Sequence, residues 1–177
     1  AAAEEAEFWL KNFERLNSAL LWPDSKWEPF IARFKSDAGE PGWGLHVDRE
    51  LQPGELPEPM DVAQGYWSRQ ERRKSSTWRE LKGFILGFIA LIVRLFAGRR
   101  VLVCVDAKNL VSLWDKGGSK HQELHLLLRQ LWELCQEHKI DLVLQWIPRG
   151  ENELADYLSK LLDSSDWKIN PTIFRRL

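Results

Sequence analysis

The sequence predicts an α/β fold, a mixed β-sheet of five strands with helices on both of its faces. Two observations lead to this fold class. Three short segments in the first half show alternating or mixed apolar patterns separated by turn residues, which is typical of an antiparallel meander. Two continuous apolar segments in the second half alternate with amphipathic helical segments, which is typical of parallel strands connected by helices.

Composition narrows the class of protein further. The 177 residues are enough for one domain with flanking structure, and the net charge of −1 gives no overall basic field for nucleic acid. Two cysteines cannot build a disulfide framework and favour a reducing, intracellular compartment. The most apolar segment, residues 83–93, is too short to cross a membrane. The first residues show no secretory signal, and we expect the chain to be part of a longer protein.

The first half is predicted to begin with a separate helical segment. Trp9, Phe13 and Leu16 recur at helical spacing and predict a helix over residues 4–20, and the remainder of 1–28 is a linker. Three strands are then expected, at residues 29–37, 43–47 and 61–68.

The second half is predicted to alternate helices and strands. A polar, basic loop at residues 69–76 precedes a long helix from Thr77 to Ala97, which Gly98 ends. The remaining elements are a strand at 101–106, helices at 107–115 and 120–138, a strand at 140–147 and a helix at 152–162. Residues 29–162 therefore form the predicted domain, and 163–177 form a tail.

Four carboxylates stand at ends of these elements. Asp37 and Asp106 end strands, and Glu80 and Asp156 lie in the first turns of helices. Because such ends meet at one edge of an α/β sheet, we expect the four side chains to converge. Carboxylates in one place repel each other unless a cation lies among them, and oxygen ligands suit Mg²⁺ or Mn²⁺. Two such ions can activate water for attack on a phosphodiester.

Each carboxylate taken alone also has an ordinary structural interpretation. Thr77 and Glu80 have the spacing of a capping box, in which the glutamate bonds to the backbone at the start of a helix. Asp156 shares a helical face with Lys160, which is typical of a solvated surface, and Asp37 fits a turn residue. The four residues together favour a functional site.

Four segments in order, FKSDAGEPGWG, SSTWRELKGF, VLVCVDAKN and WIPRGENELADYLSK, resemble a type 1 ribonuclease H domain. The resemblance covers about residues 29–160. More narrowly, it is to the ribonuclease H region of reverse transcriptases from tyrosine-recombinase-encoding (DIRS-like) retrotransposons. The opening segment EFWLKNFERLNSALLW is similar to the connection that follows the polymerase in those elements. The resemblance implies a ribonuclease H-like fold with strand order 3-2-1-4-5.

The resemblance also implies a function and a site. The implied activity is divalent-metal-dependent hydrolysis of the RNA strand of RNA–DNA hybrids, with two Mg²⁺ or Mn²⁺ ions and a reverse transcriptase domain N-terminal in the same polyprotein. The implied catalytic and metal-binding residues are Asp37, Glu80, Asp106 and Asp156. The candidate nucleic-acid contacts are Arg72, Arg73, Lys74, Lys108 and Asn152.

Two positions depart from the family pattern. Many relatives carry a histidine where this chain has Trp146, and an asparagine where it has Ala107. These departures leave open an alternative, a catalytically weak or inactive module of the same fold with a structural or hybrid-binding role. Another nuclease or integrase of the same superfamily is a third interpretation.

Overall fold

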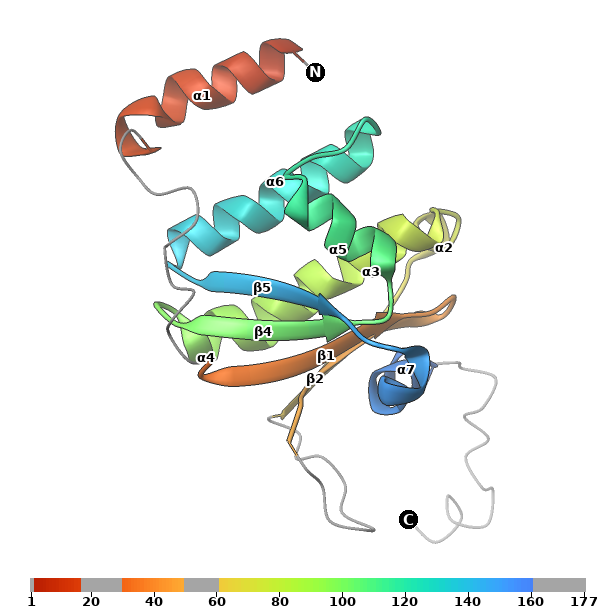
Figure 1. The fold of residues 1–177 in the computed structure, drawn as a ribbon. Helices are drawn as coiled ribbons and strands as arrows, with labels where there is room; N and C mark the ends of the chain where they lie inside the picture. Colours follow the sequence, from red (N-terminus) through yellow and green to blue (C-terminus); the bar gives the residue numbers. More distant parts are fainter. Residues whose placement is uncertain (1, 17–29, 50–60, 161–177) are drawn as a thin grey trace, which may run out of the picture.

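The computed structural model describes residues 2–16, 30–49 and 61–160 and contains the predicted five-stranded mixed sheet. The strands follow the order β3-β2-β1-β4-β5, which confirms the expected topology (Figure 1). Their bounds are β1 Ala32–Ala38, β2 Gly42–Val47, β3 Val62–Tyr66, β4 Arg100–Val105 and β5 Asp141–Trp146. The predicted linker after the first helix and the C-terminal tail lie outside the described residues.

Pairing in the sheet changes direction at β1. This strand pairs antiparallel with β2 and parallel with β4. β3 continues the antiparallel half, and β5 continues the parallel half. Residues 101–105 of β4 are all buried, as expected for a central parallel strand covered on both faces.

Helices cover both faces of the sheet (Figure 1). On one face lie α3 Ser76–Gly87, α5 Lys108–Asp115 and α6 Gln122–Glu137; α7 Glu153–Lys160 lies on the other. α7 packs closely on β2, because Gly44 has no side chain between this strand and Leu158. The main core lies on the α3 face, where Phe34 and Val103 of the sheet meet Phe84 and Leu131.

The long predicted helix is continuous but not uniform. α3 passes into a π-helical segment, Phe88–Val93, and then α4, Arg94–Phe96. Gly98 follows with a φ of 72°, a left-handed conformation that suits glycine, and the predicted end of the helix is confirmed.

The prediction of a loop at residues 69–76 was wrong in part. α2, Arg69–Arg72, forms a single helical turn there. Ser68 accepts a hydrogen bond from the backbone of Glu71, and the Glu71 carboxylate accepts one from the backbone of Ser68. This capping box stabilises a turn that is too short and too polar to show a helical apolar pattern.

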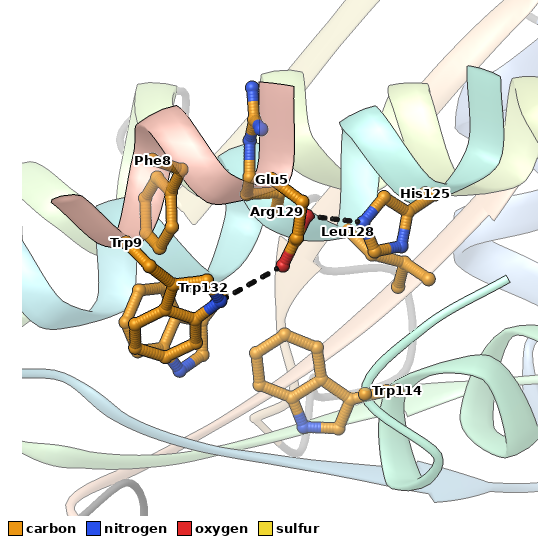
Figure 2. A pocket seen from close by; sticks show the side chains of 9 residues that line it. Glu5, Phe8, Trp9, Trp114, His125, Leu128, Arg129 and Trp132 are labelled. Carbon is orange, nitrogen blue, oxygen red and sulfur yellow. Dashed lines mark hydrogen bonds and ion pairs between the residues drawn. The ribbon is translucent and has the colours of Figure 1, made fainter. Parts of the chain in front are cut away.

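The N-terminal helix, α1 Ala2–Leu16, lies beside α6 (Figure 1). Figure 2 shows Glu5 accepting a hydrogen bond from Trp9 Nε1 at 3.2 Å and pairing with His125 Nε2 at 3.2 Å. Phe8 meets the ring of Trp132 edge-on at 5.9 Å between ring centroids. These contacts come from residues 5–9 of α1, in the two turns before the exposed Phe13.

The face of α1 that packs differs in part from the predicted one. Trp9 and Phe13 were expected to lie on one apolar face; Trp9, with a relative exposure of 41%, lines a pocket beside α6, whereas Phe13, with 60%, does not line it. The pocket, of ≈ 210 Å³, lies between α1 and α6 and is lined in part by Trp114. Within the described part of the chain, no helix combines the length and the apolar character that a membrane span requires.

Substitution of Gly44 tests the close approach of α7. A Cβ at this position would lie 2.5 Å from the Leu158 Cβ, so Gly44→Ala must displace α7. We expect a loss of about 1–3 kcal/mol in the free energy of unfolding, measured by urea denaturation. Gly150→Ala is the matched control, because no atom lies within 4 Å of its added Cβ. Equal denaturation midpoints for the two variants would contradict the close packing.

Two phenylalanines of α1 test how this helix is held. Phe8→Ala removes the contact with Trp132, whereas Phe13→Ala removes an exposed ring from the same helix. A helix of this length is marginal alone, so we expect amide hydrogen exchange in α1 to rise about tenfold in the first variant. The second variant should exchange like the wild type. Equal exchange in both variants would show that Phe8 does not anchor α1.

Candidate active site

Three of the four predicted carboxylates line one small cavity at the edge of the sheet. Its wall is formed by Ser36, Asp37, Ala38, Glu80, Val105, Asp106, Ala107 and Leu110. Ser36 of β1 pairs with Val105 of β4, and the two strands run parallel. The next residue along the chain, Asp37 within β1 or Asp106 just after β4, therefore lies at the same end of this parallel pair. The structure brings these two residues and Glu80 to one cavity.

Glu80 reaches this cavity from α3 and has no capping role. The cap of α3 is Ser75, whose hydroxyl accepts a hydrogen bond from the backbone of Trp78 at 3.2 Å. The capping box suggested by Thr77 and Glu80 is therefore wrong, because the helix begins before Thr77. Glu80 lies one turn after Ser76, the first residue of α3. It is partly buried and lines the cavity with the ends of β1 and β4.

The cluster is electrostatically unfavourable as it stands. Burial raises the pKa of Asp37, and the charges of Asp106 and Asp156 raise it further, although the Ser159 hydroxyl opposes them. Burial also raises the pKa of Glu80, followed by the charges of Asp106 and Asp37. Two carboxyl groups that resist ionisation beside a third are a donor set that a divalent cation would stabilise.

Asp156 approaches the cluster from the opposite face of the sheet and differs in its environment. Its carboxylate accepts hydrogen bonds from Arg149 at 2.8 Å and from Lys160. Partial burial acts to raise the pKa of Asp156, but these two cations outweigh it and hold the pKa below its usual value. Asp156 is therefore kept ionised, with its charge shared between two cations at the surface.

The carboxylates do not form a ready-made metal site. Across residues 2–16, 30–49 and 61–160, no three acidic, histidine or cysteine side chains lie together as a metal-binding group. The cavity that Asp37, Glu80 and Asp106 share has the oxygen chemistry for Mg²⁺ or Mn²⁺, and their mutual repulsion gives a reason to bind one.

Two buried polar residues hold the end of β1 around Asp37 in place. Asn152 directly precedes α7, and Ser159 lies within it. Asn152 is 0% exposed, and its Nδ2 donates to the Ser36 carbonyl at 3.0 Å. Ser159 is also 0% exposed and donates to Asp37 Oδ2 at 2.9 Å. The predicted nucleic-acid contact at Asn152 does not fit this position, because the side chain is turned into the protein. Sequence reasoning missed Ser159, although it lies with Ala155 and Leu158 on the buried face of α7.

The predicted basic contacts belong to two segments, α2 with the residues that follow it and the start of α5. Arg72 and Arg73 are exposed at the end of α2. Lys74 instead pairs with Glu123 at 2.6 Å. Lys108 is exposed at the start of α5, with its ammonium 4.2 Å from the ring centroid of Trp146. Contact of these residues with nucleic acid stays a prediction.

Solved structures of ribonuclease H domains share this fold. The N-terminal RNase H domain of rv2228c from Mycobacterium tuberculosis is 22% identical, with a TM-score of 0.53 over 76% of this chain and 95% of that one. LC11-RNase H1, isolated from compost and solved with an RNA/DNA hybrid, is 16% identical, with a TM-score of 0.60 over 76% and 98%.

A viral reverse transcriptase also contains this fold. The foamy viral protease-reverse transcriptase in complex with an RNA/DNA hybrid is 10% identical, with a TM-score of 0.52 over 89% of this chain and 26% of that one. At these identities the likeness shows the fold alone. A search of curated proteins gave no match.

A family match adds evidence at the level of sequence. The family described as "Reverse transcriptase-like" matches residues 60–162, a segment that includes Glu80, Asp106 and Asp156 but not Asp37. This segment is more than half of the 177 residues. The chain therefore belongs to the reverse transcriptase-like family and has the ribonuclease H-like fold.

Proposed function

We propose that this protein is a divalent-metal-dependent endonuclease that hydrolyses the RNA strand of RNA–DNA hybrids. The observation that carries this proposal is the shared cavity of Asp37, Glu80 and Asp106 at the edge of a ribonuclease H-like sheet. The family match and the similar structures solved with RNA/DNA hybrids support the substrate class.

The candidate metal ligands are Asp37, Glu80, Asp106 and Asp156. When bound, two Mg²⁺ or Mn²⁺ ions supply the charge that activates a water and stabilises the leaving oxygen of a phosphodiester. The protein's own task is to keep the ligands ionised and in place. Ser159 donates to Asp37, which opposes the rise in its pKa, and Arg149 and Lys160 keep Asp156 ionised.

We infer in addition that the chain is the ribonuclease H part of a reverse transcriptase polyprotein from a DIRS-like retrotransposon, with a reverse transcriptase domain N-terminal to it and an intracellular location. The support is the resemblance of the four motif segments together with the reverse transcriptase-like family match. In this arrangement α1 belongs to the connection, and residues 29–162 and 163–177 are the proposed domain and tail.

Two observations favour a second candidate, a module of the same fold that binds hybrid without cutting it. No three metal-ligating side chains of the described residues are grouped closely, and Arg149 and Lys160 already occupy Asp156. Both candidates bind hybrid, so metal-dependent cleavage separates them.

Cleavage of a labelled RNA–DNA hybrid in Mg²⁺ or Mn²⁺ tests the proposed activity. We expect the wild type to cut only the RNA of the hybrid, with duplex DNA and duplex RNA left intact. Asp106→Asn keeps the shape of the side chain but loses the charge, and we expect cleavage to fall at least roughly 100-fold. Gel analysis of the end-labelled products measures both results.

Glu137→Gln is the control for this experiment, since it changes an exposed carboxylate to an amide at the end of α6, away from the cavity. Its cleavage rate should equal that of the wild type. Cleavage by Asp106→Asn at the wild-type rate would remove Asp106 from the metal site. No cleavage by the wild type in either metal, with hybrid binding retained, would favour the non-cutting module.

The raised pKa of Glu80 predicts an effect on stability with a definite sign. A carboxyl group whose pKa is higher in the folded state than in the unfolded state binds its proton more tightly when folded, so stability falls as pH rises through the folded pKa. Without divalent cations, we therefore expect Glu80→Gln to be more stable than the wild type at pH about 7, well above the ordinary carboxyl pKa. Below pH about 4 the difference should disappear, because Glu80 is then protonated.

Urea denaturation at the two pH values measures this difference, with Glu137→Gln again as the control. Addition of Mg²⁺ should raise the stability of the wild type more than that of Glu80→Gln, because an ion that binds only the folded state stabilises it. A wild type that is more stable than Glu80→Gln at neutral pH without metal would show that Glu80 is not under electrostatic strain.

A further inference from the structure

Trp146, the last residue of β5, makes two contacts with the segment that carries Asp106. Its indole Nε1 donates to the Asp106 carbonyl at 3.1 Å. The Lys108 ammonium lies 4.2 Å from the centroid of the indole ring. Register explains both contacts, because Trp146 pairs with Val105 and so stands beside the point where the chain leaves β4. One side chain therefore contacts the residues on both sides of Ala107.

This tryptophan is not required by either hydrophobic core. Its side chain is 40% exposed, and it belongs to neither buried cluster of the described residues. Its neighbour Gln145 is exposed as well, so β5 leaves the core before its last two residues. An exposed indole that donates one hydrogen bond and carries one cation on its ring is placed to orient other groups.

Trp146 also forms one wall of a groove beside the carboxylate cavity. The other lining residues come from α5 and its C-cap Lys116, and Lys108, Ser112 and Lys116 follow one another at intervals of four. Among the described residues, neither Lys108 nor Lys116 has a carboxylate partner within ion-pair distance. The lining also contains one acidic residue, Asp115. The lining extends from Lys108, two residues after Asp106, to Lys116.

We propose that Trp146 is a positioning residue, and that the groove along α5 binds the phosphate backbone of a nucleic-acid strand whose scissile region lies at the carboxylates. Lys108 contacts a phosphate, and Trp146 holds the Lys108 side chain over its ring and fixes the Asp106 peptide. The inference rests on the proposed function for the identity of the strand. The two lysines of the groove complement the phosphates, and the groove adjoins the segment that carries Asp106, because Trp146 bonds to the Asp106 carbonyl.

The physical advantage of this arrangement is restriction of a flexible side chain. A free lysine loses much rotamer freedom when it binds a phosphate, whereas one already held on an aromatic ring loses less. The same indole fixes the backbone of Asp106, so phosphate contact and carboxylate position are linked through one residue.

Hybrid binding in EDTA tests the proposal without any need for activity. Fluorescence anisotropy of a labelled RNA–DNA hybrid gives the Kd at several NaCl concentrations. If one phosphate contact is lost, Lys108→Met should raise the Kd roughly 5- to 10-fold at 0.1 M salt and reduce the slope of log Kd against log salt by about 0.9. Lys139→Met is the matched control, because this exposed lysine precedes β5 at the opposite end of the strand.

The coupling between the two residues tests positioning. Trp146→Leu should weaken binding as Lys108→Met does, and the double variant should be no weaker than Lys108→Met alone, because the tryptophan acts through the lysine. Trp146→Phe keeps a ring under Lys108 but loses the N–H donor to Asp106. We expect its Kd to stay within about twofold of the wild type, whereas kcat falls roughly tenfold or more at unchanged KM.

Additive losses in the double variant, or a wild-type Kd and salt slope in Lys108→Met, would overturn the proposal. Wild-type protein that binds and cuts hybrid while these variants behave normally would refute the groove and leave the proposed function intact. Wild-type protein that binds no hybrid would remove both.

Discussion

The parallel pairing of β1 with β4 is the constraint on which the site depends. It sets Ser36 opposite Val105 and so brings Asp37 and Asp106, far apart in the sequence, to one edge of the sheet. A shift of one residue in this register would turn one of the two carboxylates to the wrong side of the sheet, because side chains alternate along a strand. The alternating burial of β1 secures the register, because Phe34 lies in the main core whereas its neighbour Arg33 is exposed.

The two faces of the sheet then supply the other residues of the candidate site. α3 brings Glu80 from one face, and α7 brings Asp156 and Ser159 from the other. Both approaches are close because glycine stands at the contacts, Gly83 against Trp43 and Gly44 against Leu158. This arrangement makes ionisation of the carboxylates unfavourable, because burial and mutual repulsion raise the pKa of Asp37 and Glu80. A site that destabilises the fold in this way is typical of function rather than of structure.

Much of the fold followed from local patterns. Five strands and the major helices were predicted within a few residues, because apolar period and turn residues are local signals. The errors share one cause. The turn α2, the Ser75 cap and the face of α1 that uses Phe8 each depend on a few specific hydrogen bonds or ring contacts, which leave little trace in the pattern. The predicted nucleic-acid contact at Asn152 fails for a related reason. Nothing in the local sequence indicates that this polar side chain is buried.

The sequence by itself determined the kind of elements, their order and the position of each carboxylate at an element end, because these depend on residue spacing along the chain. Only the tertiary structure decided how the carboxylates differ. Burial and neighbouring charges make Asp37 and Glu80 resist ionisation, whereas Arg149 and Lys160 keep Asp156 charged. It also decided that Trp146 lies against both Asp106 and Lys108. Such differences arise from contacts between segments distant in sequence, and the physical reason is that desolvation and charge interactions depend on three-dimensional neighbours.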